Sequence, residues 1–203
     1  MSILTIDPGF SAWAALVGIA AGLALSTAAG LRVFVPLLLT GLAARLGYLK
    51  LVPGMAWLES DMALVAFATA TILEIGAYYV PWLDNALDAL GTPAAVGAGI
   101  VATAAVTPDL PPLLRWTIAI LAGGGTAGLV QASTALLRLK SSLATAGAGN
   151  PVVATAELVG AVAFSVLAVL APFLAVAGAV IVIAFLVRRF LASRRGQSHA
   201  NTA

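Results

Sequence analysis

The chain has 203 residues, of which 62% are hydrophobic and only 9% are charged, with a formal net charge of +2. Soluble domains carry roughly 25% charged residues, so this composition excludes an ordinary soluble enzyme, a nucleic-acid-binding protein and a disordered chain. It leaves a polytopic membrane protein. Because the chain has no cysteine, a thiolate metal site and a thiol nucleophile are also excluded.

Apolar segments follow one another along the chain and are predicted to form helices, because a membrane span needs about 20 mainly apolar residues. They cover residues 10–31, 33–46, 62–83, 93–106, 113–137, 152–170 and 171–187. Segments 33–46 and 93–106 are short. Pro172 divides the last apolar run, which is too long for one span, and predicts a helical break. The runs are continuous rather than alternating, which excludes barrel strands.

The predicted fold class is therefore all-α, a polytopic helical membrane bundle of six or seven spans. We expect an N-terminal segment over residues 1–9, the bundle over residues 10–190 and a basic tail over residues 191–203. Ala and Gly are frequent in the apolar segments. Small residues let helix backbones approach closely, so they predict tight packing between the helices.

The basic residues favour one orientation without deciding the number of spans. With seven spans and an outer N-terminus, the cytoplasmic side receives Arg32, Arg138, Lys140, Arg188, Arg189, Arg194 and Arg195. The positive-inside rule favours this arrangement. If 33–46 is instead re-entrant, six spans remain and both termini are cytoplasmic. The C-terminal tail is cytoplasmic in both alternatives.

Two stretches resemble each other and suggest an internal repeat. GLALSTAAGLR covers residues 22–32 and GLVQASTALLR covers residues 128–138. Each carries Ser-Thr-Ala, ends on an arginine and is followed by an apolar helix with one glutamate, Glu74 or Glu157. Six spans make the two halves an inverted repeat, which is common in transporters. If there are seven spans, the helices that carry the two similar stretches run in the same direction, whereas the helices that carry Glu74 and Glu157 run in opposite directions.

Ionisable residues on apolar segments are the main candidates for a site, because charge at membrane depth costs about 2.5–3.5 kcal/mol on insertion scales. Glu74 lies deep in its segment, and Glu157 lies closer to the start of its own. We expect both to converge with Arg32 and Arg138 on one polar cluster. Either the four residues form static ion pairs, or they line a cavity whose carboxylates bind a cation or exchange protons.

The stretch KSSLATAGAGNP, residues 140–151, is predicted to be an irregular polar loop. Asn150 would cap a helix that begins at Pro151. A helix N-terminus attracts anions, and Lys140 beside it adds positive charge. Together with Ser141 and Ser142, this loop is either a plain cytoplasmic connection or the mouth of a solute path.

Three stretches carry a family resemblance: AAGLRVFVPLLLTGLAARLGYL, then Glu74 followed by VPWLDNALDALGTP, then GNPVVATAELV. The chain resembles, over roughly residues 14–187, the bacterial membrane family catalogued as domain of unknown function 4126. The resemblance implies a multi-pass protein of the bacterial inner membrane. It implies no activity.

The leading expectation is a small-solute or ion transporter or channel, rather than an enzyme, with no cofactor. The solute or ion path is assigned to Glu74, Glu157, Arg32, Arg138, Lys140, Ser141, Ser142 and Asn150. The alternatives are a membrane scaffold or a lipid-handling protein that holds a phosphate headgroup. The expected partners are membrane lipids, the solute or ion and a second copy in a homo-oligomer. Asp84 and Asp88 share a helical face that either binds a cation or is only solvated.

Overall fold

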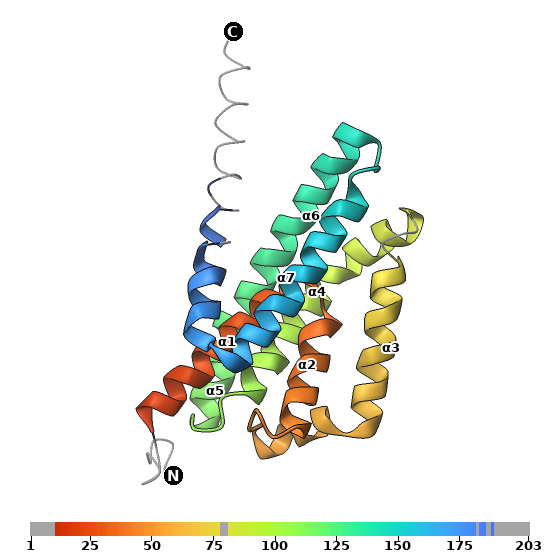
Figure 1. Cartoon of the computed structure of the whole chain (residues 1–203). Helices are drawn as coiled ribbons and strands as arrows, with labels where there is room; N and C mark the ends of the chain where they lie inside the picture. Colours follow the sequence, from red (N-terminus) through yellow and green to blue (C-terminus); the bar gives the residue numbers. More distant parts are fainter. Residues whose placement is uncertain (1–10, 78–80, 182, 186–187, 189–203) are drawn as a thin grey trace.

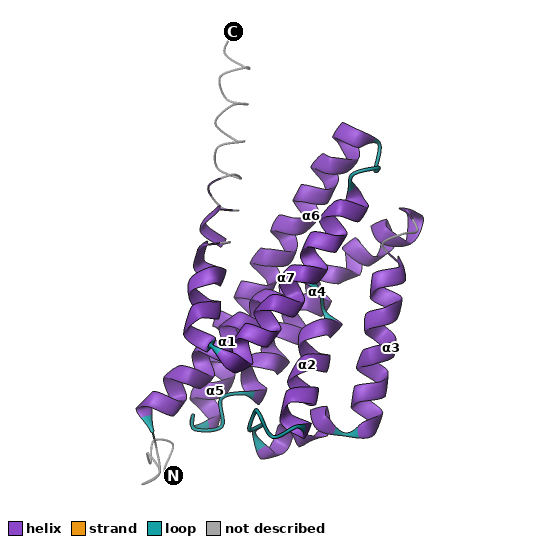
Figure 2. Ribbon diagram, viewed as in Figure 1, coloured by secondary structure: helices purple, strands orange, loops and turns teal. Residues whose placement is uncertain are grey.

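The computed structural model describes residues 11–77, 81–181, 183–185 and 188, without the side chains of residues 81–90. Within these ranges the regular elements are helices, which agrees with the predicted all-α class (Figure 2). They are α1 (Ala12–Leu31), α2 (Phe34–Arg45), the 3-10 helix η1 (Pro53–Glu59), α3 (Asp61–Ala77), α4 (Pro81–Ala105), α5 (Pro112–Ile118), the π-helical turn η2 (Ala119–Gly124), α6 (Gly125–Thr145), α7 (Asn150–Leu170) and a last helix, Pro172–Phe185. The predicted N-terminal segment 1–9 and tail 191–203 lie outside the described residues.

Successive helices alternate in direction (Figure 1). α1 rises obliquely to the middle of the bundle, α2 descends from there, α3 rises at one edge and α4 descends. The continuous helix from α5 to α6 then rises, α7 descends beside it, and the last helix rises again. α1 and α6 thus run the same way, whereas α3 and α7 run oppositely. The two similar stretches therefore lie on helices that run in the same direction.

The interior is built from small side chains and the exterior from large apolar ones. α1 packs against α4, α6 and α7, and its buried residues are mostly Ala, Gly, Ser and Thr. Large exposed side chains lie on the outer helices, among them Val65, Ile72, Leu121, Leu129 and Val159. A protein in water would bury such residues first. The distribution is typical of a surface that faces lipid.

Three helices are long and apolar enough to cross a membrane: Ala12–Leu31, Pro112–Thr145 and Asn150–Leu170. A fourth is added if the pair Pro53–Glu59 and Asp61–Ala77, bent by 58°, is counted as one broken span. Counted by length and composition, the helices of the described residues give fewer spans than the six or seven that were predicted. Within the described residues there are also three shorter apolar stretches of helix: Phe34–Arg45, Gly91–Ala105, which is part of α4, and Pro172–Phe185.

Several predicted boundaries were wrong. Residues 93–106 do not form a separate helix, because Pro93 lies inside α4, which begins at Pro81. Residues 81–83, expected at the end of the segment 62–83, belong to α4, and residues 78–80 lie outside the described residues. The helix expected over 113–137 continues to Thr145. By contrast, the break at Pro172 is confirmed, since α7 ends at Leu170 and Ala171 adopts φ −152° and ψ 67°.

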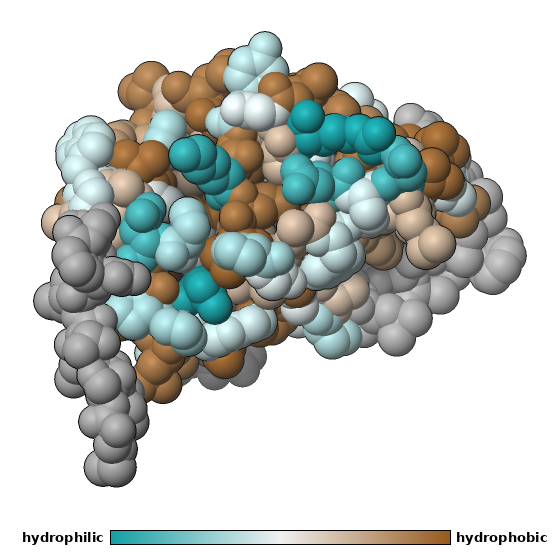
Figure 3. All heavy atoms as spheres, turned by 90° about the horizontal axis from the view of Figure 1, so that it is seen from below, coloured by the Kyte–Doolittle hydropathy of each residue, from teal (hydrophilic) through white to brown (hydrophobic). Residues whose placement is uncertain are grey.

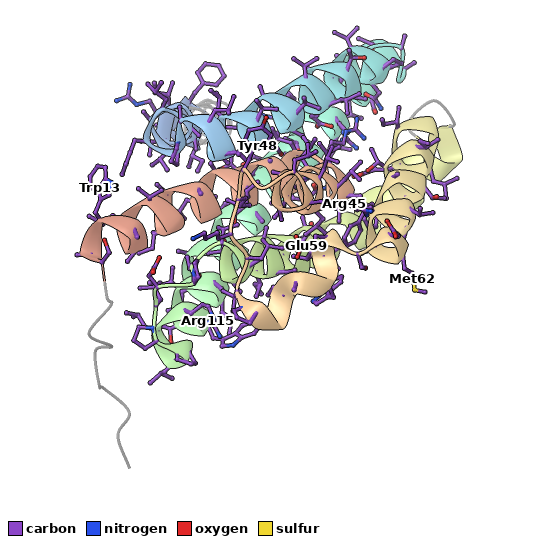
Figure 4. The ribbon with its side chains drawn as sticks, turned by 60° about the horizontal axis from the view of Figure 1, so that its bottom comes forward. Trp13, Arg45, Tyr48, Glu59, Met62 and Arg115 are labelled. Atoms are coloured by element: carbon purple, nitrogen blue, oxygen red, sulfur yellow. The ribbon has the colours of Figure 1, made fainter. Side chains whose placement is uncertain are left out.

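Charged side chains gather at one end of the bundle, where the connections α2–α3 and α4–α5 lie (Figure 3). These connections and the start of α5 carry Arg45, Lys50, Glu59, Asp61, Asp109 and Arg115. Figure 4 shows Arg45, Glu59 and Arg115 at this end. Arg45 and Asp61 form an exposed ion pair. A charged end beside an apolar wall is what a membrane–water interface requires.

Close contact between α4 and α6 depends on glycine at chosen positions. A Cβ on Gly99 would lie 2.6 Å from Cβ of Ala127 and 2.9 Å from the backbone oxygen of Gly123. A Cβ on Gly97, on the same helix, meets nothing within 4 Å. The two glycines therefore differ in packing although they share a helix.

We expect Gly99→Ala to lower the free energy of unfolding by about 1–3 kcal/mol, because the contacted backbone and Cβ atoms cannot move aside cheaply. Gly97→Ala is the matched control and should raise it by up to about 1 kcal/mol, since Ala is the better helix former. Thermal unfolding in detergent, followed by the loss of monodisperse protein, measures both. Equal destabilisation by the two variants would contradict the assigned packing.

Candidate functional site: a buried ionic cluster at a helix break

The site begins where the backbone breaks between α1 and α2. α1 ends at Leu31, and Arg32 adopts the extended conformation, with φ −146° and ψ 123°. α2 begins at Phe34 and carries Pro36 in its first turn. Proline suits the first turn of a helix, because the amide it lacks has no partner within the helix there. The break lies in the middle of the bundle (Figure 1), where free backbone groups need protein partners.

Glu74 of α3 supplies the partner for the start of α2. Its Oε1 accepts a hydrogen bond of 2.9 Å from the amide of Val33, and its Oε2 accepts one of 3.3 Å from the amide of Phe34. The side chain is buried, with 7% exposed. The carboxylate thus caps α2 from another helix and faces the positive end of its dipole.

Glu157 of α7 holds the two arginines together. The Nε of Arg138 donates to its Oε1 over 3.1 Å, and the Nη2 of Arg138 donates to its Oε2. The Nη2 of Arg32 lies 3.8 Å from the same Oε2 and donates a 2.6 Å hydrogen bond to the carbonyl oxygen of Ala154. A side-on pair of an arginine with a carboxylate is among the strongest charge-assisted contacts in proteins.

The structure thus brings the four predicted groups into one neighbourhood. Arg32 and Arg138 are each 2% exposed and Glu157 is 5% exposed. Both arginines also attract the Glu74 carboxylate electrostatically. Among the described side chains, the cluster thus holds two groups of each sign. Its members come from the α1–α2 junction, α3, α6 and α7, so the cluster joins helices that are distant in sequence.

The predicted loop over residues 140–151 is wrong in its details. Residues 140–145 belong to α6, and the turn is limited to residues 146–149. It is made by Ala146, with φ 51°, and Gly147, with φ 90°. Helix formation continues through Ser141 and Ser142 because their neighbours favour it more than the two serines oppose it. This places the predicted mouth at the tip of a helical hairpin.

The polar side chains of this hairpin serve its own closure. Asn150 is the first residue of α7 and not its cap, and its Nδ2 donates 2.8 Å to the Oγ of Ser142. The amide of Gly149 donates 2.9 Å to the Oγ1 of Thr145. Lys140 is exposed on α6. These residues lie toward the tip of the α6–α7 hairpin.

The sequence analysis did not identify the polar stripe on α6 to which Arg138 belongs. Gln131, Thr134 and Arg138 are all buried and recur three and four residues apart, which places them on one helical face. This periodicity was readable in the sequence. Elsewhere in the core, the hydroxyls of Ser26 and Thr103 share a 2.7 Å hydrogen bond between α1 and α4. No sequence signal pairs those two, because they are far apart in the chain.

Among the residues that the structure describes, no group of three or more His, Cys, Asp or Glu is placed to hold a metal ion. The side chains of Asp84 and Asp88, which carried the alternative of a cation site, lie outside the described set.

Fold and site together define an α-helical protein with helices apolar enough to span a membrane and a cluster of ionisable side chains buried among them. The chain belongs to the family described as Domain of unknown function (DUF4126), whose model matches residues 19–191. This confirms the resemblance seen in the sequence. No curated protein and no solved structure matches the chain.

Proposed function

We propose that this protein is a transporter or channel for a small solute or ion and that the buried cluster is its site. One observation carries the proposal: four ionisable groups meet at a break between two helices, α1 and α2. Ionisable groups inside a membrane are costly and usually mark substrate or proton pathways. Transporter sites are typically formed at discontinuous helices near the middle of the bilayer.

The proposed setting is the bacterial inner membrane, with the chain crossing it in six or seven segments. Alternating helix directions and the large exposed apolar side chains support a multi-pass arrangement. The proposed orientation places the α6–α7 hairpin and the tail 191–203 in the cytoplasm. Lys140 and Arg188, with the basic residues of the tail, support this through the positive-inside rule.

The geometry favours transport over the lipid-handling alternative. That alternative needs Arg138 and Lys140 to face a phosphate headgroup together. Arg138 is instead buried against Glu157, whereas Lys140 is exposed. The scaffold alternative treats the cluster as a permanent structural link, and flux measurements separate it from transport.

The test is flux through liposomes that contain the full chain. Entrapped pyranine reports protons, and light scattering reports swelling in isosmotic potassium salts and neutral solutes. We expect at least one of these to cross faster than in protein-free liposomes. Glu157→Gln and Arg138→Gln should each lower that flux at least tenfold, and Glu74→Gln should abolish its dependence on pH.

Asp61→Asn is the matched control, because it also removes a carboxylate beside an arginine, but in the exposed pair with Arg45. Its flux should equal that of the wild type. If all variants carry every probe as the wild type does, or if the wild type carries none, the protein is a scaffold and the proposal fails.

A further inference from the structure

A groove of about 180 Å³ lies between α2 and α7 on the outside of the bundle. Its walls are one face of each helix, because the lining residues recur at helical spacing on both. They include Leu39, Leu42 and Leu46 of α2 and Val166, Val169 and Leu170 of α7. Leu46 and Leu170 are largely exposed and form its rim. The groove is therefore open to whatever surrounds the bundle.

The groove begins where the close packing between α2 and α7 ends. Nearer the helix break, Val35 and Leu39 of α2 share one apolar cluster with Leu158 and Ala161 of α7. One turn beyond Leu39, Leu42 is exposed although it faces the groove. Space therefore remains between the two helices that their own side chains do not fill.

The walls of the groove suit an apolar occupant. Apart from Tyr48 and Ser165, the described residues that line it are apolar. Ser165 is fully buried, and its hydroxyl already donates 2.7 Å to the carbonyl oxygen of Ala161. A polar solute would lose its hydration there without a replacement. α7 is also long and apolar enough to cross a membrane, so the groove adjoins the lipid-facing wall of the bundle.

One end of the groove is polar. Tyr48, which lines it, is 71% exposed and belongs to the connection between α2 and η1, at the charged end of the bundle (Figure 4). Tyrosine is enriched where a membrane meets water, because its ring is apolar and its hydroxyl is polar. The exposed Lys50 follows two residues later and adds a positive charge. An apolar groove that ends at a hydroxyl and a cation matches an amphiphile with an anionic head.

We propose that this groove holds one acyl chain of a membrane phospholipid, whose phosphate lies at the end marked by Tyr48 and Lys50. An acyl chain is narrow and flexible, so it fits between two helices that touch. Another helix does not fit there, because it is about 10–12 Å across with its side chains. The gain comes from packing rather than from the hydrophobic effect, since bulk lipid tails are as apolar as the groove. The inference is independent of transport, because the lining residues lie outside the ionic cluster.

The experiment counts the phospholipids that stay with the full chain. The protein is reconstituted in vesicles of palmitoyl-oleoyl phosphatidylglycerol and phosphatidylcholine, extracted and washed with increasing detergent, and then weighed by native mass spectrometry. Lipids that touch the protein on one side only should leave first. We expect one phospholipid per chain to resist washing after the others have left.

Ala43→Leu fills the groove from within, because Ala43 is a half-buried residue of its wall. This variant should lose the last phospholipid at a detergent concentration at which the wild type keeps it. Ala66→Leu is the matched control, since it makes the same change on the exposed face of α3. It should keep the lipid as the wild type does. Lys50→Gln should release the lipid at less detergent than the wild type, because the phosphate loses its cation.

Thermal unfolding of the washed proteins gives a second measure, which does not depend on how well a variant folds. Phospholipid added back should raise the unfolding temperature of the wild type and of Ala66→Leu, but not that of Ala43→Leu. The inference is overturned if the wild type keeps no lipid, if Ala43→Leu and Ala66→Leu behave alike, or if Lys50→Gln releases lipid as the wild type does. A dimeric wild type with a monomeric Ala43→Leu would also overturn it, because a second copy would then occupy the groove.

Discussion

Replacing Glu157 by Gln should lower the free energy of unfolding by about 3–5 kcal/mol, the usual cost of removing one partner from a buried ion pair. The carboxylate lies between Arg138 and Arg32, and all three groups are buried. Its loss removes a negative charge from beside two buried arginines. Unfolding in detergent measures the effect.

The double variant Arg138→Gln/Glu157→Gln separates charge from packing. It removes one charge of each sign, so the net charge of the interior equals that of the wild type. We expect it to recover at least half of the stability lost by Glu157→Gln. A double variant less stable than the single one would show that the cluster contributes mainly by packing and would contradict the electrostatic account.

The second large effect concerns the cap of α2. Glu74→Ala removes the acceptors of two buried amides, and we expect a loss of about 2–4 kcal/mol, because an unsatisfied buried donor costs about 1–3 kcal/mol. Glu74→Gln keeps one side-chain oxygen and should lose about half as much. Hydrogen exchange at Val33 and Phe34 should accelerate in Glu74→Ala, since these amides donate to the carboxylate.

Asp61→Asn serves as the control on the same helix. Asp61 is exposed and pairs with an exposed arginine, so its replacement should change stability by no more than about 1 kcal/mol. If Glu74→Ala is as stable as Asp61→Asn, or if exchange at Val33 and Phe34 is unchanged, Glu74 does not hold the start of α2.

The helical class and the residues of the cluster were predictable because each follows from local chemistry. Lipid offers no hydrogen bonds to the backbone, so long apolar runs form helices, in which the backbone N–H and C=O groups bond to each other. Pro172 stops α7 for an equally local reason. Glu74, Glu157, Arg32 and Arg138 stand out because charge on apolar segments is costly wherever the helices finally pack.

Local sequence signals did not predict the helix boundaries correctly where helix-breaking residues stand among helix-forming ones. Pro93 suggested a helix start, yet α4 runs through it from Pro81. The serines and glycines after Lys140 suggested a loop, yet α6 continues to Thr145. α4 continues through Pro93 despite a propensity cost of about 3 kcal/mol for a proline, and α6 continues because residues such as Leu143 and Ala144 favour a helix more than the two serines oppose it.

By itself the sequence determined that this protein is a helical bundle suited to lipid, with two arginines and two glutamates that must find partners inside it. Only the tertiary structure decided which partners they find. Glu74 was expected to join both arginines in one cluster, either in ion pairs or around a cavity, and its two oxygens cap the amides of Val33 and Phe34, while Glu157 receives both arginines. The reason is physical: a charge on a helix fixes the cost of its burial, whereas its partner depends on how α1, α3, α6 and α7 pack, and that is a property of the whole bundle.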